Sequence, residues 1–325
     1  MISSRRITLR LSRAAASVRS SEKDSHSLLN RPNSIWATHL RQCQEEFPLT
    51  TEGELDDGNA RFFIHVDRKS DIALFRQAIT SERATLLNER LSINWGGWRM
   101  VQATLNMLRR AHSVGTSDYY QLLSDSCYPI KSNRDIAGKL HASTNNYITI
   151  NHELTPQSQR FWWIGQYHWP DLLPSRTPRR FHKLLRRLQS RLPPRRLPRG
   201  LRLYKGWQWW CLSYECIDYI LRYIESHPEV VRFFRYTRIP DETFFHTIIG
   251  SSKFAETLSP GIDEGTITGN HYIRWLGGKP CVLKADAFEA LIKSDACFAR
   301  KLNETESFQL IRMLREYCLT GHAAI

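Results

Sequence analysis

The sequence predicts an α/β fold with a mostly parallel central sheet flanked by helices. The first observation is that strand-like and helix-like segments alternate from residue 61 to residue 150, an order typical of parallel sheets. The second is a predicted strand at 61–67 that is rich in aromatic and β-branched residues and ends in Asp67. Because ligands of such folds bind beyond the carboxyl ends of the strands, Asp67 is a candidate site residue, with a helix cap as the alternative role.

The elements of the first half follow from the spacing and type of the apolar residues. Strands are expected at 61–67, 91–95, 117–124 and 147–150, and helices at 35–43, 72–79, 98–111 and 133–140. In the helix over 98–111 the residues Val101, Leu105 and Leu108 fall on one face. Gly96 and Gly97 precede this helix, and residues without a side chain let the backbone pass close to another segment.

The alternation breaks after Glu153 and resumes later in the chain. Strands are expected at 206–213 and 281–283, and helices at 214–225, 286–292 and 304–318. The helix over 214–225 presents an apolar face, which consists of Ile217, Ile220, Leu221 and Ile224.

Two adjacent acids, Asp241 and Glu242, follow Pro240 and precede an apolar segment. Proline suits the first turn of a helix, where the helix dipole favours negative charge. An acid at the mouth of a buried element can act as a general base. Ordinary helix-terminus chemistry is the alternative interpretation of the pair.

The chain of 325 residues is long enough for one large domain or two ordinary ones. We expect a basic, disordered arm at 1–30 and a single domain at 31–325. A surface excursion rich in Arg and Pro, which contains a basic helix at 180–192, is expected at about 170–205. This excursion is interpreted either as a solvated basic face or as a contact with anionic lipid or an anionic acceptor.

The net charge of +14 indicates anionic partners, such as nucleotide phosphates or an acidic membrane face. Nucleic acid is not expected, because the basic stretch matches no standard nucleic-acid-binding motif. The ten tryptophans suit flat ligands such as sugar rings. Seven cysteines without a CxxC pair argue against a disulfide framework and a zinc ribbon. We therefore expect a cytoplasmic protein, with peripheral contact at the inner membrane face through 176–202 left open.

Six stretches, taken in order, resemble one family. They are 63–70, 95–97, 122–132, 206–210, 240–242 and 298–301. Together they are similar to the motifs of the core-2/I-branching β-1,6-N-acetylglucosaminyltransferases, a family that also contains the peptide O-xylosyltransferases. The resemblance covers roughly 61–303 and implies a GT-A-like fold. It also implies inverting transfer of a sugar from a UDP-sugar to a hydroxyl of a glycan acceptor, as a step of glycan biosynthesis. UDP-N-acetylglucosamine is the expected donor, and UDP-xylose is the alternative.

The resemblance further implies that no metal ion takes part, and no Asp-x-Asp motif ends a predicted strand. Another cation must then stabilise the charge that develops on the leaving UDP. Arg300 and Lys301 are well placed in the sequence for this role, and the resemblance implies a Lys at the position that Lys301 matches. A second basic residue is expected just before the strand at 281–283, where the alignment places Gly278 with Lys279 beside it.

Other roles also come from the resemblance. Glu242 matches the general base, Asp67 a position near the uridine, and Trp275 an aromatic near the acceptor sugar. Trp209 is expected to pack the core beneath the base, with ligand binding as the alternative. Cys127 stands where many relatives have an acid.

A departure from the family at the N-terminus leaves a competing hypothesis open. Relatives begin with an apolar strand, but only 27–33 could supply it here, and nothing earlier resembles a strand. Either 27–33 forms this strand despite a weak strand pattern, or the start of the sequence is misassigned. If the site has degenerated, the chain is instead a binding module for a glycan or an anionic surface.

Overall fold

The computed structural model describes residues 34–40, 55, 59–79, 81–115, 117–155, 158, 179–189, 191, 195–259 and 267–320, with the backbone alone described for 34–40. The predicted arm at 1–30 lies outside these residues, as does much of the predicted excursion at 170–205. Of that excursion, the structure confirms the basic helix as α5, Arg179–Gln189. The single domain over 31–325 stays a prediction.

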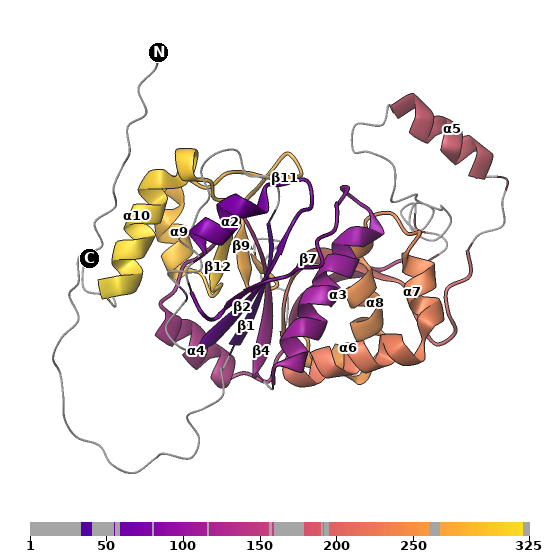
Figure 1. Ribbon diagram of the computed structural model, residues 1–325, viewed down its shortest axis with the longest axis horizontal. Helices are drawn as coiled ribbons and strands as arrows, with labels where there is room; N and C mark the ends of the chain where they lie inside the picture. The colour runs from indigo at the N-terminus through magenta and orange to yellow at the C-terminus, as the bar shows by residue number, and fades with distance from the viewer. Residues whose placement is uncertain are drawn as a thin grey trace, which may run out of the picture. The chain divides into compact units, whose positions relative to one another are not determined.

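A six-stranded sheet forms the centre of the described fold, with the strand order β3-β2-β1-β4-β7-β6 (Figure 1). Its strands are β1 Ser34–Leu40, β2 Ala60–Val66, β3 Ala84–Leu86, β4 Tyr119–Ser124, β6 Tyr147–Glu153 and β7 Tyr204–Ser213. The first four pair in parallel, whereas β7 runs antiparallel to both of its neighbours. The carboxyl ends of β2 and β4 therefore open at the same edge of the sheet.

A smaller sheet has the order β5-β12-β9-β8, and its central pair, β12 and β9, is parallel. Its strands are β5 Cys127–Pro129, β8 Ile267–Thr268, β9 His271–Ile273 and β12 Phe298–Arg300, and a separate hairpin joins β10 Trp275–Leu276 to β11 Lys279–Pro280. Four of the described strand pairings are parallel and five are antiparallel. The α/β class is confirmed, but the described sheets are mixed rather than mostly parallel.

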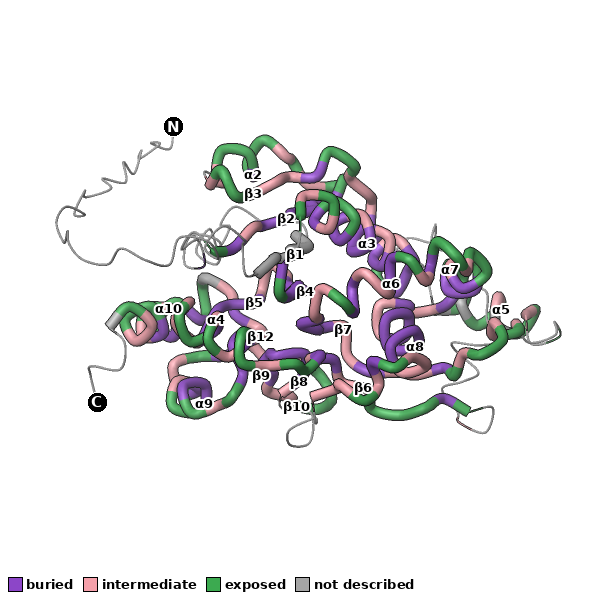
Figure 2. Tube along the Cα trace, turned by 90° about the horizontal axis from the view of Figure 1, so that it is seen from below, coloured by how far each residue is buried: buried purple, intermediate pink, exposed green. Residues whose placement is uncertain are grey.

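The helices cover both sheets. They are α2 Ile72–Ala78, α3 Trp98–Ser113, α4 Asn133–His141, α6 Tyr214–Ser226, α7 Pro228–Phe234, α8 Phe244–Gly250, α9 Phe288–Lys293 and α10 Glu304–Thr320, with short 3-10 turns at η2 Pro240–Glu242, η3 Lys253–Thr257 and η4 Ala285–Ala287. Figure 2 shows α3, α6, α7 and α8 on one side of the six-stranded sheet, and α4, α9 and α10 beside the small sheet. The predicted apolar faces of α3 and α6 are buried in the main core. Among the described residues, no helix has the length and apolar content needed to cross a bilayer.

The helix predicted over 35–43 is wrong, because the structure has the strand β1 there. β1 pairs in parallel with β2 on one side and β4 on the other. A parallel strand paired on both edges needs no alternation of polar and apolar residues, so its local pattern imitated a helix. The first strand, for which the sequence analysis found no candidate other than 27–33, is therefore the central strand β1 at Ser34–Leu40.

The strands predicted over 91–95 and 281–283 are also wrong. In the first segment, side chains rather than a neighbouring strand bind backbone groups. For example, the amide of Leu91 donates to His65 Nε2 at 2.9 Å. The second segment forms separate bonds rather than a continuous ladder, such as Leu283 N–H to the carbonyl of Lys301 at 2.8 Å and Ser307 Oγ to the carbonyl of Leu283 at 2.6 Å. The place beside β2 belongs to β3, which the sequence did not predict.

Candidate active site

The turn that carries Glu242 is fixed to the segment before α3. Ile239 has left-handed backbone angles, φ 54° and ψ 54°, and its amide donates to the carbonyl of Gly96 at 2.9 Å. Gly96 itself has φ +74°, and a Cβ placed there would lie 3.4 Å from Ile239 Cγ1. Glycine tolerates both this φ and the close approach. The buried ring of Pro240 then starts the 3-10 turn η2, which ends at Glu242.

Glu242 is paired with a cation that the sequence analysis did not select. Its Oε2 contacts Nζ of Lys205, from β7, and the two side chains are 24% and 12% exposed. The ammonium also lies 5.7 Å from the ring centroid of Trp207. The carboxylate is thus held in one orientation while one edge stays open to solvent.

Trp275 lies against Trp207, with ring centroids 4.3 Å apart and an interplanar angle of 34°. Both side chains are half-buried. Aromatic faces of this kind suit the flat face of a sugar ring. Lys205 contacts both Glu242 and Trp207, so the structure brings the predicted base and the predicted acceptor aromatic into one cluster.

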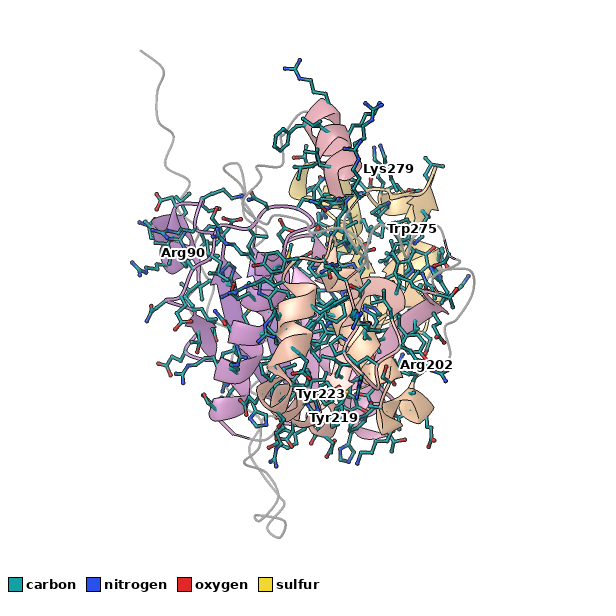
Figure 3. All side chains as sticks on the ribbon, turned by 90° about the vertical axis from the view of Figure 1, so that its right-hand side faces the viewer. Arg90, Arg202, Tyr219, Tyr223, Trp275 and Lys279 are labelled. Carbon is teal, nitrogen blue, oxygen red and sulfur yellow. The ribbon has the colours of Figure 1, made fainter. Side chains whose placement is uncertain are left out.

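Lys279 lies on the β10–β11 hairpin, where it pairs with Leu276 (Figure 3). The turn between them is Gly277-Gly278, with φ 57° and 73°, as a tight hairpin turn requires. Side chains alternate across a strand, so Lys279 projects from the face opposite to Trp275. Within the described residues, no hydrogen bond or ion pair joins Lys279 to the other predicted site residues.

Arg300 ends β12 and has neutral partners. Its Nη1 donates to Ser126 Oγ at 2.7 Å and also to Ser124 Oγ; Ser124 ends β4, and Ser126 lies in the turn that follows it. Its guanidinium lies 4.2 Å from the ring centroid of Trp209. These contacts orient the guanidinium without neutralising its charge. Lys301 follows directly, half-buried, with its carbonyl bound to the 281–284 segment.

Cys127 lies beside Arg300. Its buried sulfur accepts from the amide of Ser124 at 3.4 Å and lies 3.8 Å from Arg300 Nη1. Burial by itself raises the pKa of the thiol, but His271 and Arg300 outweigh burial and lower that pKa to about 7. The position where many relatives have an acid can therefore carry a negative charge here near neutral pH.

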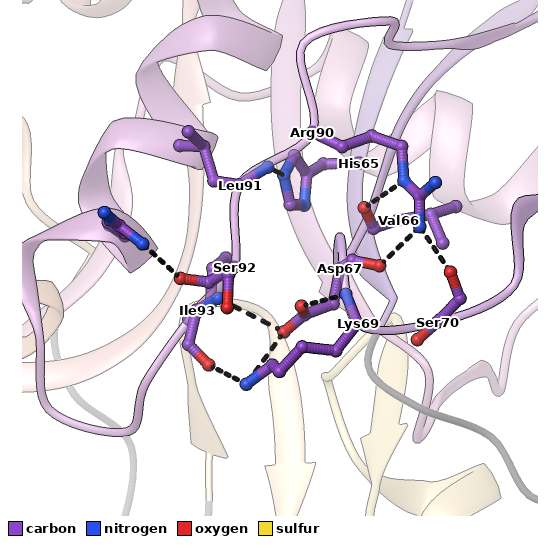
Figure 4. A network of polar contacts seen from close by, with 10 residues as sticks. His65, Val66, Asp67, Lys69, Ser70, Arg90, Leu91, Ser92 and Ile93 are labelled. Atoms are coloured by element: carbon purple, nitrogen blue, oxygen red, sulfur yellow. Dashed lines mark hydrogen bonds and ion pairs between the residues drawn. The ribbon is translucent and has the colours of Figure 1, made fainter. Parts of the chain in front are cut away.

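Asp67 holds two loops together (Figure 4). It is 3% exposed, and it accepts from the amide of Lys69 at 3.0 Å and from that of Ile93 at 3.3 Å. The ammonium of Lys69 lies 3.6 Å from its second oxygen. Both carboxylate oxygens thus have partners inside the protein. The alternative role as a helix cap is wrong, because Asp71 caps α2.

Three residues at alternate positions of β7 connect the predicted site residues. Lys205 contacts Glu242, Trp207 packs against Trp275, and Trp209 lies under Arg300. We call Lys205, Trp207 and Trp209 the β7 row. The sequence analysis did not select Lys205 or Trp207 as site residues, and it did not select Ser124 or Ser126. The sequence did contain one signal for the β7 row: a lysine and two tryptophans occupy every second position, at 205, 207 and 209.

Comparisons with known proteins identify a matching family and related enzymes. The family model described as "Branch: Core-2/I-Branching enzyme" matches residues 55–292. Xylosyltransferase 2 of Homo sapiens is 24% identical over 275 residues, which are 78% of this chain and 30% of that protein. Xylosyltransferase 1 of Rattus norvegicus is 22% identical over 295 residues, which are 81% of this chain and 32% of that protein. The chain thus spans about a third of the length of these curated relatives.

The family model covers well over half of the chain, and the mixed α/β fold is of the expected kind. The match includes the turn of Glu242, the β7 row and the hairpin of Trp275. The chain therefore belongs to the Core-2/I-Branching enzyme family of glycosyltransferases, whose fold is GT-A-like.

Proposed function

We propose that this protein is an inverting glycosyltransferase that moves a sugar from a UDP-sugar to a hydroxyl of a glycan or protein acceptor. The observation that supports this most is the β7 row, which has an acid at one end and a cation with neutral partners at the other. A displacement reaction needs these two charges on opposite sides of the reacting carbon.

In the proposed reaction Glu242 accepts the proton of the acceptor hydroxyl while its oxygen attacks the anomeric carbon. The bond from that carbon to the UDP oxygen breaks, and the configuration inverts. Arg300 faces the charge that develops on the departing diphosphate, and Lys301 is its proposed neighbour in that role. Trp275 and Trp207 supply the aromatic surface for the acceptor sugar.

Two donors are proposed. The family resemblance favours UDP-N-acetylglucosamine, whereas the relatives named as xylosyltransferases favour UDP-xylose. Side-by-side transfer assays with the two donors decide between them. We also propose that the reaction needs no metal ion, because Arg300 supplies a positive charge to the diphosphate.

Metal independence is tested by thermal melts with UDP in excess EDTA. A ligand present at about one hundred times its Kd stabilises a protein by roughly 2.7 kcal/mol. A rise in Tm in EDTA supports the proposal, and a rise that requires added manganese contradicts it.

The central test is Glu242→Gln, which removes the basic oxygen and keeps the shape of the side chain. We expect transfer to fall by about 10²–10⁴-fold, while the Kd for UDP stays within twofold of the wild-type value. Glu229→Gln, at an exposed acid of α7, is the matched control and should transfer normally. Undiminished transfer by Glu242→Gln would show that another group is the base.

One observation favours a second function, a binding module without catalysis. The ion pair with Lys205 neutralises the acid that would act as base. That hypothesis predicts that neither donor supports transfer and that UDP does not raise the Tm of the wild-type protein.

A further inference from the structure

The basic helix α5 has a second property that the sequence analysis did not use. Its apolar residues Phe181, Leu184, Leu185 and Leu188 follow the spacing i, i+3, i+4 and i+7, which places them on one face. Three of them, Phe181, Leu184 and Leu188, are 41%, 54% and 57% exposed. The apolar face of this helix is thus largely open to solvent.

The opposite face is strongly basic. The eleven residues of α5 include five Lys or Arg and no acid. Among those whose side chains are described, Arg180, Lys183 and Arg187 are all exposed. In the described structure, the helix presents an apolar face and a cationic face together.

This combination needs a partner that is apolar and anionic at once. A helix of this length is marginal in water without a covering surface. A second copy of this chain, with its net charge of +14, would repel the helix. A bilayer with anionic lipids offers an acyl boundary for the apolar face and negative head groups for the flanking Lys and Arg.

We infer that α5 is a peripheral docking helix for an anionic lipid surface. It lies in the plane of the interface, with Phe181, Leu184 and Leu188 buried at the boundary between head groups and acyl chains. The inference does not depend on the proposed transfer reaction, because it uses no residue of the candidate active site.

The return of the chain from α5 is anchored to the folded body. Arg195 donates to the carbonyl of Phe233 at 2.6 Å and to Thr237 Oγ1 at 3.0 Å, and its guanidinium lies 4.5 Å from the ring centroid of Phe233. Six residue steps separate Gln189 from Arg195, and they span at most about 21 Å when fully extended. Docking of α5 therefore holds α7, and the Glu242 turn that follows it, near the lipid surface.

The test is co-sedimentation of the full chain with vesicles. Vesicles of phosphatidylcholine with about a third phosphatidylglycerol are compared with vesicles of phosphatidylcholine alone. The wild-type protein should bind the anionic vesicles, less so at high salt, and should not bind the neutral ones. The triple variant Phe181→Ser/Leu184→Ser/Leu188→Ser keeps the charge and should lose at least about tenfold in affinity.

A second variant tests the basic face. Arg180→Gln/Lys183→Gln/Arg187→Gln should also weaken binding to the anionic vesicles by at least about tenfold. Its control removes three exposed arginines outside α5, at Arg109, Arg134 and Arg235. The control should lose less than the α5 variant does.

Three outcomes would overturn the inference. The first is no binding of the wild-type protein to anionic vesicles. The second is normal binding by the serine triple variant, which would show attraction by net charge alone. The third is a change of that variant's oligomeric state in sedimentation velocity with its vesicle affinity unchanged, which would assign the apolar face to a second copy. Unchanged Tm values of the variants confirm that each comparison is between folded proteins.

Discussion

The two ends of the β7 row hold their charged residues in opposite ways. At one end, Arg300 is oriented by two serine hydroxyls and the face of Trp209, all of them neutral. At the other end, Glu242 is oriented by the ammonium of Lys205, a full opposite charge. Both arrangements orient a charged side chain, but they leave different net charges.

The difference indicates which half of the site is ready for its ligand. A guanidinium held by neutral hydroxyls keeps its charge for an incoming anion as long as Cys127 is a neutral thiol, so the donor end is preorganised. A carboxylate paired with an ammonium shares its charge, so the acceptor end presents Glu242 oriented but partly neutralised. The comparison predicts that donor binding and transfer can be separated by mutation.

The largest expected effect is at the donor end. Arg300→Met should raise the Kd for UDP by about thirtyfold or more, since a hydrogen bond to a charged group contributes about 1.5–3 kcal/mol and the ionic attraction is lost as well. Isothermal titration calorimetry measures this Kd. Arg300→Lys keeps the charge but not the planar fork, so its Kd for UDP should lie between that of the wild-type protein and that of Arg300→Met. An unchanged Kd for Arg300→Met would remove Arg300 from the donor site.

A smaller effect is expected at the acceptor end. Lys205→Met should lower kcat/KM for the acceptor by about tenfold, because a charge-assisted hydrogen bond that orients Glu242 is lost. The Kd for UDP should stay within twofold of the wild-type value. Steady-state kinetics and calorimetry on the same preparation check both quantities, and Lys205→Arg should retain most of the activity. Equal losses in UDP binding and transfer would show that the two ends are not separate.

The local parts of the site could be predicted from the sequence. Pro240 and the two acids after it indicated a turn at the mouth of a buried helix, and the structure has η2 followed by α8 there. Gly96 indicated a close backbone approach, which is its contact with Ile239. In both cases the chemistry of neighbouring residues determines the geometry.

The non-local parts could not be predicted in this way. The pair of Lys205 and Glu242 joins residues 37 positions apart, and Arg300 reaches serines more than 170 positions away. Such contacts depend on which strands become neighbours. β1 illustrates the same limit, because only its pairing with β2 and β4 separates it from a helix of the same local pattern.

The hairpin of Lys279 shows a third kind of limit. Alignment placed Lys279 beside the position of a donor-binding cation. The Gly277-Gly278 turn determines which face of the hairpin each residue occupies, and Lys279 shares the face of Leu276 rather than that of Trp275. A shift of one residue in a strand moves a side chain to the other face.

The smallest effect concerns pH at the donor end, where Cys127 can add a negative charge. The folded pKa of its thiol is about 7, below the ordinary 9.0. The lowered pKa adds stability that is fully present above pH 9. This contribution decreases as the pH falls from 9 to 7 and is absent below pH 7. The Tm of the wild-type protein should therefore rise relative to that of Cys127→Ser between pH 7 and 9. Parallel Tm curves for the two proteins would contradict this lowered pKa.

The same titration tests whether the charge of Arg300 is free. Above pH 7 the thiolate lies 3.8 Å from Arg300 Nη1, and an ion pair at about 4 Å in a high dielectric contributes about 1 kcal/mol. The Kd for UDP should therefore rise about fivefold from pH 6 to pH 8 in the wild-type protein, beyond any rise seen in Cys127→Ser. Cys297→Ser is the matched control, because burial raises the pKa of Cys297 and keeps it a neutral thiol in this range. If the wild-type protein and Cys127→Ser share one pH dependence, no thiolate forms beside Arg300 in this range, and the lowered pKa of Cys127 is contradicted.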